Sequence, residues 1–200
     1  MLSYTSVSDT AANLAASAGA YVAAGKNVTV TDAATVAQLT AIDAANTNGA
    51  LSYSGITDAA SNLVNASGLG LSGYVTGSVA VTLNTTATRA QLAAIDQATT
   101  GALSYSSITD TANNLVNADG LGLSSYVTGS VAVTLNTAAT LAQLTAIDQA
   151  TTGTLSYTSV MDTAATLAAN VGGYVSGVVN VTVIEAVSYT HLTLPTNREV

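Results

Sequence analysis

The feature that most constrains the fold of this chain is an internal repeat. The tripeptide Leu-Ser-Tyr occurs four times, with spacings of 49, 52 and 52 residues, beginning at Leu2, Leu51, Leu103 and Leu155. Each copy is followed by an aspartate and by a tyrosine ahead of an alternating valine run. In the first three copies an Ala-Gln-Leu-x-Ala-Ile-Asp segment comes next. A period of this length predicts stacked units that bury their apolar faces against their neighbours.

Self-alignment divides the chain into five segments. They are repeat 1 (1–50), repeat 2 (51–102), repeat 3 (103–154), a truncated repeat 4 (155–186) and a tail (187–200). Met1 occupies the position that Ala50 and Ala102 hold in the alignment, so we expect the chain to open inside a unit. The tail matches no position of the repeat and resembles the in-frame translation of a sequencing-library adapter. We therefore expect it to be a non-native artefact.

One half of each unit predicts a strand followed by a helix. Residues 78–83 alternate between polar or small and apolar side chains, which places Val79, Val81 and Leu83 on the inward face. The helix then begins with a capping box, in which a threonine hydroxyl accepts from an early helix amide and a glutamine reaches back to the cap amide. The three boxes are Thr35/Gln38, Thr88/Gln91 and Thr140/Gln143. The apolar stripe of the third such helix is Leu141, Leu144 and Ile147.

The other half of each unit predicts a shorter strand and helix. In the third unit the strand carries Leu103, Tyr105 and Ile108, and Asp110 is the expected N-cap of the helix that follows. The counterparts of this aspartate are Asp9, Asp58 and Asp162. Because these carboxylates recur once per unit, whereas an active site is usually singular, we expect them to be structural.

Each half-unit is therefore a strand–helix coil of about 26 residues, the length of one coil of a leucine-rich-repeat-like protein. Crossovers between parallel strands are right-handed in nearly all proteins. The predicted fold is α/β, a right-handed repeat solenoid with a parallel sheet on one face, short helices on the other and two coils per 52-residue unit. The strands near Val28, Val79, Val131 and Val181 are expected to lie in one sheet, with Leu39, Leu92 and Leu144 behind it.

Composition and charge exclude several classes of function. Charged residues make up 7% of the chain, against about a quarter in ordinary globular proteins, and the net charge is −8. Before the tail the only cations are Lys26 and Arg89, so we expect no nucleic-acid partner, which would need clustered Lys and Arg. The uncharged run 163–184 contains Asn and Gly and aligns with upstream segments, so we expect a helix and a strand there and no membrane insertion.

The chain offers little catalytic chemistry. It contains no cysteine, and its one histidine, His191, lies in the tail. Without the tail, Ser-His-Asp, Cys-His and metal-His arrangements are impossible. We therefore expect no catalytic residues, no bound cofactor and no enzymatic activity.

A second aspartate series is less easily explained. Asp43, Asp96 and Asp148 lie near helix C-termini, where the helix dipole disfavours a negative charge. They could accept hydrogen bonds from the following Thr/Gly loop, or they could bind calcium as a row of carboxylates. No Gly-Gly-x-Gly-x-Asp nonapeptide and no EF-hand loop accompanies them, so they are weak calcium candidates. The tyrosines are expected to be packing ladders, with platforms for sugar stacking as the alternative.

The motifs Asp-Thr-Ala-x-x-Leu, Tyr-Val-x-Gly-x-Val-x-Val-Thr and Ala-Gln-Leu-x-Ala-Ile-Asp give residues 2–186 a resemblance to the tandem repeats of very large bacterial surface or secreted proteins. The resemblance implies an extracellular or cell-surface location, neighbouring repeats of a longer chain as partners and an unknown surface ligand. We expect a structural or adhesive spacer. A calcium-stiffened secreted repeat is the alternative, and an ice-binding face with outward Thr and Ala is a remote one.

Overall fold

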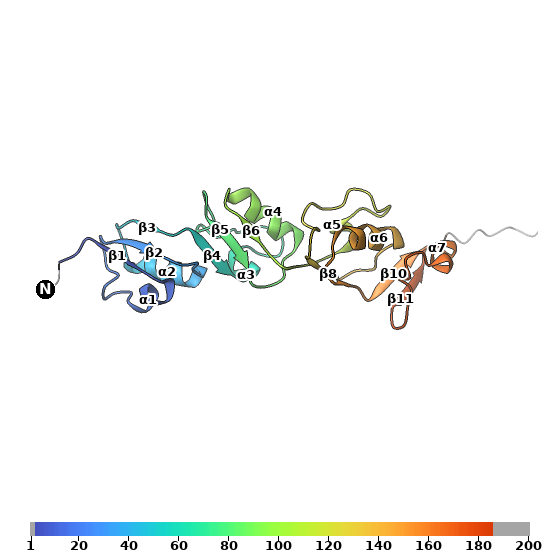
Figure 1. Cartoon of the computed structure of the whole chain (residues 1–200), viewed down its shortest axis with the longest axis horizontal. Helices are drawn as coiled ribbons and strands as arrows, with labels where there is room; N and C mark the ends of the chain where they lie inside the picture. The colour runs from blue at the N-terminus through green and yellow to red at the C-terminus, as the bar shows by residue number, and fades with distance from the viewer. Residues whose placement is uncertain (1–2, 186–200) are drawn as a thin grey trace, which may run out of the picture.

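The computed structural model describes residues 3–185 of the chain. It is an α/β structure, elongated from the N-terminal to the C-terminal part, in which strands and helices alternate (Figure 1). In chain order the elements are β1 (Ser6–Asp9), α1 (Ala11–Ala16), β2 (Asn27–Val30), α2 (Val36–Ala45), β3 (Leu51–Ser52), β4 (Gly55–Asp58), α3 (Ala60–Leu63), β5 (Ala80–Leu83), α4 (Arg89–Ala98), β6 (Leu103–Ser104), β7 (Ser107–Asp110), α5 (Ala112–Leu115), β8 (Ala132–Leu135), α6 (Leu141–Ala150), β9 (Leu155–Ser156), β10 (Ser159–Asp162), α7 (Ala164–Ala169) and β11 (Asn180–Val183). The predicted non-native tail, residues 187–200, lies outside the described residues.

Every pairing between the named strands is parallel, as predicted, but the strands do not form one sheet. They form four sheets, in the orders β1-β2-β3, β4-β5-β6, β7-β8-β9 and β10-β11. Val28 and Val181 therefore lie in different sheets, and Val79 and Val131 come just before β5 and β8. The prediction of a single continuous sheet was wrong.

The sheets are interrupted because the chain must turn to start each long helix. Consecutive sheets are joined by one bridge each, at Ala34↔Ile56, Ala87↔Ile108 and Ala139↔Val160. The next residue after each of these alanines is the threonine that caps a long helix. The strand before each of these alanines is four residues long, and the chain turns after it. Only the alanine before the cap then pairs with the first strand of the next sheet.

The inward alternation is confirmed in β2, β5 and β8, although Val79, which was also expected to face inward, is half-buried and comes just before β5. In β5, Val81 and Leu83 are buried, whereas Thr82 between them is exposed. The same alternation holds in β2 and β8, where Val28, Val30 and Val133 are buried. These side chains belong to one cluster of buried apolar residues that runs from Ala11 in α1 to Tyr174.

All three predicted capping boxes are present. In α4, the Gln91 amide donates to Thr88 Oγ1 at 3.2 Å, and the Thr88 amide donates back to Gln91 Oε1 at 2.9 Å. The boxes of α2 and α6 have the same geometry. The predicted stripe is confirmed as well: Leu141, Leu144 and Ile147 are buried. Fully burying a leucine side chain contributes about 2 kcal/mol, so these helices are fixed mainly by their apolar face.

The short helices begin one residue later than predicted. Asp110 is the last residue of β7, and the N-cap of α5 is Thr111, whose hydroxyl accepts from the Asn114 amide at 3.1 Å. Thr10 and Thr163 cap α1 and α7 in the same way. The aspartate before each cap is therefore free to bond elsewhere.

No helix within residues 3–185 is long and apolar enough to cross a membrane. The uncharged run 163–184 contains α7 and β11, which confirms the prediction of a helix and a strand.

Candidate functional site

The aspartates that end the strands connect two helices. Asp110 lies at the end of β7 and is 4% exposed. One of its oxygens, Oδ1, accepts from the Thr111 amide at 2.7 Å and from Asn114 Nδ2 at 2.6 Å. The other, Oδ2, accepts from the amide of Arg89, the first residue of α4, at 2.8 Å. A carboxylate at a helix N-terminus stabilises the unpaired amides and the positive end of the helix dipole.

The same contact recurs along the chain. Asp58 Oδ2 accepts from the Val36 amide of α2 at 2.8 Å, and Asp162 Oδ2 accepts from the Leu141 amide of α6 at 3.1 Å. In each case the acceptor lies 21 or 22 residues after the donor. The long helix of one coil is therefore capped by the strand of the next coil.

The short helices are capped across coils too, by residues that sequence reasoning missed. The first amides of α1, α3, α5 and α7 donate to Asp32, Thr85, Thr137 and Glu185, at 2.7, 3.0, 3.0 and 2.8 Å. Each of these acceptors stands two residues after the end of a strand. That shared position was the available signal, but the acceptors differ in residue type and so do not form an obvious motif.

The second aspartate series meets tyrosines of the following coil, not the Thr/Gly loop. The hydroxyls of Tyr74, Tyr126 and Tyr174 donate to Oδ2 of Asp43, Asp96 and Asp148, at 3.3, 3.1 and 3.1 Å. Each aspartate lies near the end of a long helix, at the position that the sequence analysis identified. The contact gives a structural reason for a negative charge at a place where the helix dipole disfavours it.

Each of these tyrosines also contacts a partner tyrosine. Tyr105 donates its hydroxyl to the Tyr126 carbonyl at 3.0 Å, and the two rings meet edge to face with centroids 6.5 Å apart. The pairs Tyr53/Tyr74 and Tyr157/Tyr174 repeat this arrangement. Burial raises the pKa of Tyr105 and Tyr126 above the ordinary value, and the Asp96 carboxylate raises the pKa of both further. The rings are used for packing between coils, which agrees with the ladder interpretation.

Buried threonines that follow α4 and α6 form hydrogen bonds to backbone groups of two different segments. Thr99 Oγ1 lies 2.5 Å from the Val79 carbonyl and accepts from the Gly101 amide at 2.9 Å. Thr151 makes the same bonds in the next unit. Asn46 stands at this position in the first unit and is 1% exposed, but its side-chain nitrogen and oxygen have no hydrogen-bond partner among the described residues.

The threonines of the sheets form short rows and not a long array. Thr57 is in register with Thr82, and Thr109 with Thr134, each in a separate sheet. Ser104 and Ser156 end the respective rows. Thr86, next to the bridging residue Ala87, adds one hydroxyl to the second row, with its Oγ1 3.0 Å from Thr109 Oγ1. Each row of the described residues is therefore short.

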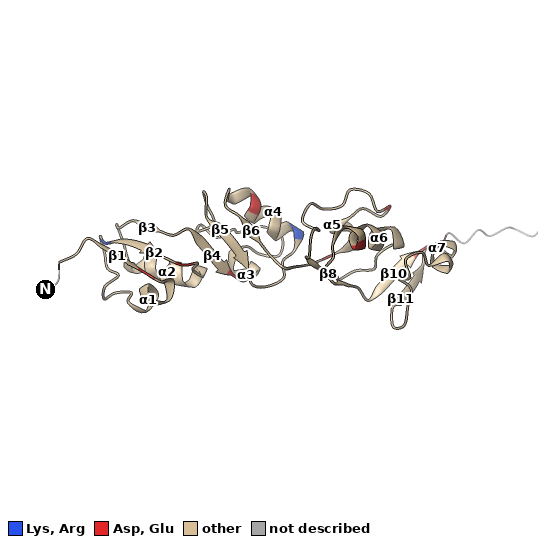
Figure 2. Ribbon diagram, viewed as in Figure 1, with Lys and Arg blue, Asp and Glu red and all other residues tan. Residues whose placement is uncertain are grey.

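Charged side chains are dispersed. The acidic residues are scattered singly along the structure, and the two cations of residues 3–185 lie in different units (Figure 2). Lys26 Nζ donates to the Tyr4 carbonyl at 2.7 Å and lies 4.8 Å from the centre of the Tyr4 ring. Within the described part of the chain, no group of three or more His, Cys, Asp or Glu side chains is placed to hold a metal ion.

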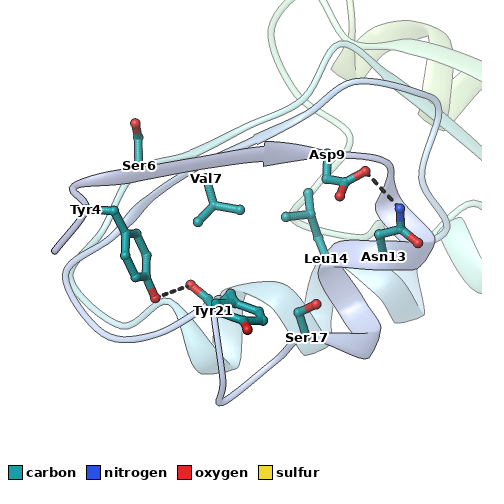
Figure 3. Close-up of a pocket in the computed structure, with 8 residues that line it drawn as sticks. All are labelled: Tyr4, Ser6, Val7, Asp9, Asn13, Leu14, Ser17 and Tyr21. Atoms are coloured by element: carbon teal, nitrogen blue, oxygen red, sulfur yellow. Dashed lines mark hydrogen bonds between the residues drawn. The ribbon is translucent and has the colours of Figure 1, made fainter. Parts of the chain in front are cut away.

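A hollow of about 380 Å³ lies at the N-terminal end of the structure, between β1 and α1 (Figure 3). It is lined by Tyr4, Ser6, Val7, Asp9, Asn13, Leu14, Ser17 and Tyr21. Tyr4 donates its hydroxyl to the Tyr21 carbonyl at 2.8 Å, and Asn13 donates to Asp9 Oδ1 at 2.9 Å. The Asn13 contact lowers the pKa of Asp9, as does the bond from the Thr10 amide. These residues pair with one another and provide no nucleophile with an adjacent base.

Comparison of the chain with models of protein families, with curated proteins and with solved structures finds no match.

Proposed function

We propose that this chain is a right-handed repeat solenoid that acts as a structural or adhesive spacer, without catalysis. One observation carries the proposal: the first amide of every helix in residues 3–185 is capped by a side chain of the following coil. The residues with distinctive chemistry are thus engaged in holding one coil to the next. Such a chain acts through its length and its surface.

The regular separation of contacting residues supports two coils per unit. The capping bonds, the Tyr-to-carbonyl bonds and the threonine bonds mostly join residues 20 to 25 positions apart. The strands are parallel and are connected by segments that contain helices. Connections of this type are right-handed in nearly all proteins, which supports the proposed hand.

The proposed setting is the exterior of a bacterial cell. The resemblance of residues 2–186 to repeats of large surface proteins supports it. The proposed partners are neighbouring repeats of a longer chain and an unidentified surface ligand.

Deleting one whole unit tests the spacer. Removal of residues 103–154 joins Ala102 to Leu155, which restores the sequence register of the repeat. We expect the shortened chain to stay folded and its maximum dimension by small-angle X-ray scattering to fall by one unit, because each unit contacts only its neighbours. Deletion of residues 103–128 is the matched control: it removes Asp110, which caps α4, and should unfold part of the chain. Loss of all structure in the in-register deletion would refute the spacer.

A calcium-stiffened repeat is the second candidate, because Asp43, Asp96 and Asp148 recur at one position of each long helix. A ligand that binds only the folded state at a hundredfold excess over Kd stabilises it by about 2.7 kcal/mol. Thermal melting with calcium and then with chelator distinguishes the candidates. An unchanged midpoint favours the passive spacer, whereas a calcium-dependent rise abolished by changing the three aspartates to Asn favours calcium.

A further inference from the structure

The surface that holds the hollow differs from its counterparts in the interior of the chain. Tyr21 is 62% exposed, whereas its counterpart Tyr174 is 9% exposed. The hydroxyls of the three later tyrosines reach an aspartate on a long helix of the preceding unit. The Tyr21 hydroxyl makes no hydrogen bond within residues 3–185, where no long helix precedes it.

The strand beside the hollow shows a second difference. Val7 of β1 is half-buried, whereas the residues at its position in the later units, Ile56, Ile108 and Val160, are fully buried. Those three residues form the bridges to the alanines that precede the long helices. In the described structure β1 pairs with β2 alone, so the other edge of β1, at Val7, is unpaired.

Asp9 supplies a third difference. Like Asp58 and Asp110, it accepts from the next amide and from an asparagine four residues on. Those two aspartates use their remaining oxygen to cap a long helix of the preceding unit. Asp9 Oδ2 makes no such bond within the described residues.

A hydroxyl, a strand residue and a carboxylate oxygen thus lack the partners that one long helix and its preceding alanine supply elsewhere in the chain. We propose that the hollow is a docking site for the long helix of one further unit, of sequence Ala-Gln-Leu-x-Ala-Ile-Asp. The aspartate of that helix accepts from Tyr21, its first amide donates to Asp9, and its apolar stripe covers the half-buried Val7. This inference rests on the proposed solenoid and names the partner of its open face.

The test adds a unit to the full chain. A copy of residues 51–102 is placed directly ahead of Leu2, in place of Met1, which keeps the repeat register. We expect the amides of α1 to exchange with solvent about tenfold more slowly than in the original chain, because the docked helix suppresses local opening. A chain with the same copy inserted between Ala102 and Leu103 is the matched control: it shows whether the copy folds, while leaving the hollow uncovered.

A double-mutant cycle isolates the predicted contact. Asp96→Asn, made in the added copy alone, and Tyr21→Phe should each reduce the protection of α1, and the two changes together should reduce it by less than the sum. Unchanged exchange in α1, or strictly additive effects, in a chain whose added unit is folded would overturn the docking site. The spacer proposal would survive either result, since it depends on the unit deletion.

Discussion

Two strands of this chain have the same sequence and opposite burial. β2 and β11 both read Asn-Val-Thr-Val. In β2, Val28 and Val30 are 1% and 4% exposed, whereas in β11, Val181 and Val183 are 47% and 55% exposed. β2 is paired on both sides and followed by α2, whereas β11 pairs only with β10, and no helix follows it within residues 3–185. The valines of such a strand are therefore buried by the adjacent coil, and the local sequence alone does not determine their burial.

The largest expected difference in stability between the interior of the chain and its end concerns the aspartates that cap helices. Changing Asp110 to Ala removes three hydrogen bonds from a buried carboxylate and leaves the first amide of α4 without its acceptor. We expect a loss of about 3 kcal/mol in the free energy of unfolding, measured by urea denaturation. Asp9→Ala is the matched control at the exposed end, and its loss should be clearly smaller. Equal losses would show that the cross-coil bond contributes nothing.

The identical strands allow a direct comparison of packing. Val28→Ala should lower the free energy of unfolding by about 2 kcal/mol, because two buried methyl groups are lost and a cavity remains. Val181→Ala changes the same local sequence at an exposed site and should cost less than about 0.5 kcal/mol. The measurement is again urea denaturation of both variants. A similar cost at both sites would contradict the claim that neighbouring coils provide the burial.

The first unit can be made more like the second. Asn46→Thr replaces a buried amide that lacks partners by the residue present at Thr99 and Thr151. We expect a gain of about 1 kcal/mol, seen as a rise of about 2–4 °C in the midpoint of thermal unfolding. Asn48→Gly in the same loop is a useful control, since Asn48 has a φ of 67° that glycine adopts more readily. A lower midpoint for Asn46→Thr would mean that the asparagine has a partner in solution.

The smallest expected effect is the alkaline response of the tyrosine pairs, because Tyr105 and Tyr126 are only half-buried. Burial and the nearby Asp96 raise the pKa of Tyr105 and Tyr126, so the folded state holds these protons more tightly than the unfolded state. The resulting stability is fully present below pH about 10 and is lost as the pH rises through the folded pKa. Asp96→Asn should lower the pKa of both tyrosines, which can be followed by tyrosinate absorbance. An unchanged titration would rule out the Asp96 contact.

Local patterns predicted much of the fold. The alternation in residues 78–83 indicated the inward side chains of β5, and the Thr-x-x-Gln pairs indicated the start of each long helix. Both signals depend on residues within four positions of each other, so the sequence displays them directly. The parallel direction of the strands followed from the regular recurrence of strand and helix.

Contacts between coils were harder to predict. Asp110 was recognised as a helix-capping residue, but its bond to Arg89 joins residues 21 positions apart and belongs to another helix. Asp96 was identified as unusual because of its place on the helix, while its partner Tyr126 comes 30 residues later. The interruption of the sheet was missed because it depends on the three-dimensional turn from Ala87 into the cap of α4.

Amide hydrogen exchange in β2 and β11 tests the central claim most directly. Val28 and Val181 have the same neighbouring residue on the N-terminal side, so their intrinsic exchange rates are closely matched. The Val28 amide donates to the Ala50 carbonyl of the next coil at 2.7 Å, whereas the Val181 amide has no such partner in the described residues. We predict that Val28 exchanges at least about a hundredfold more slowly than Val181, because opening it requires separating two coils. Equal rates at the two valines would contradict the conclusion that each coil is stabilised by the next.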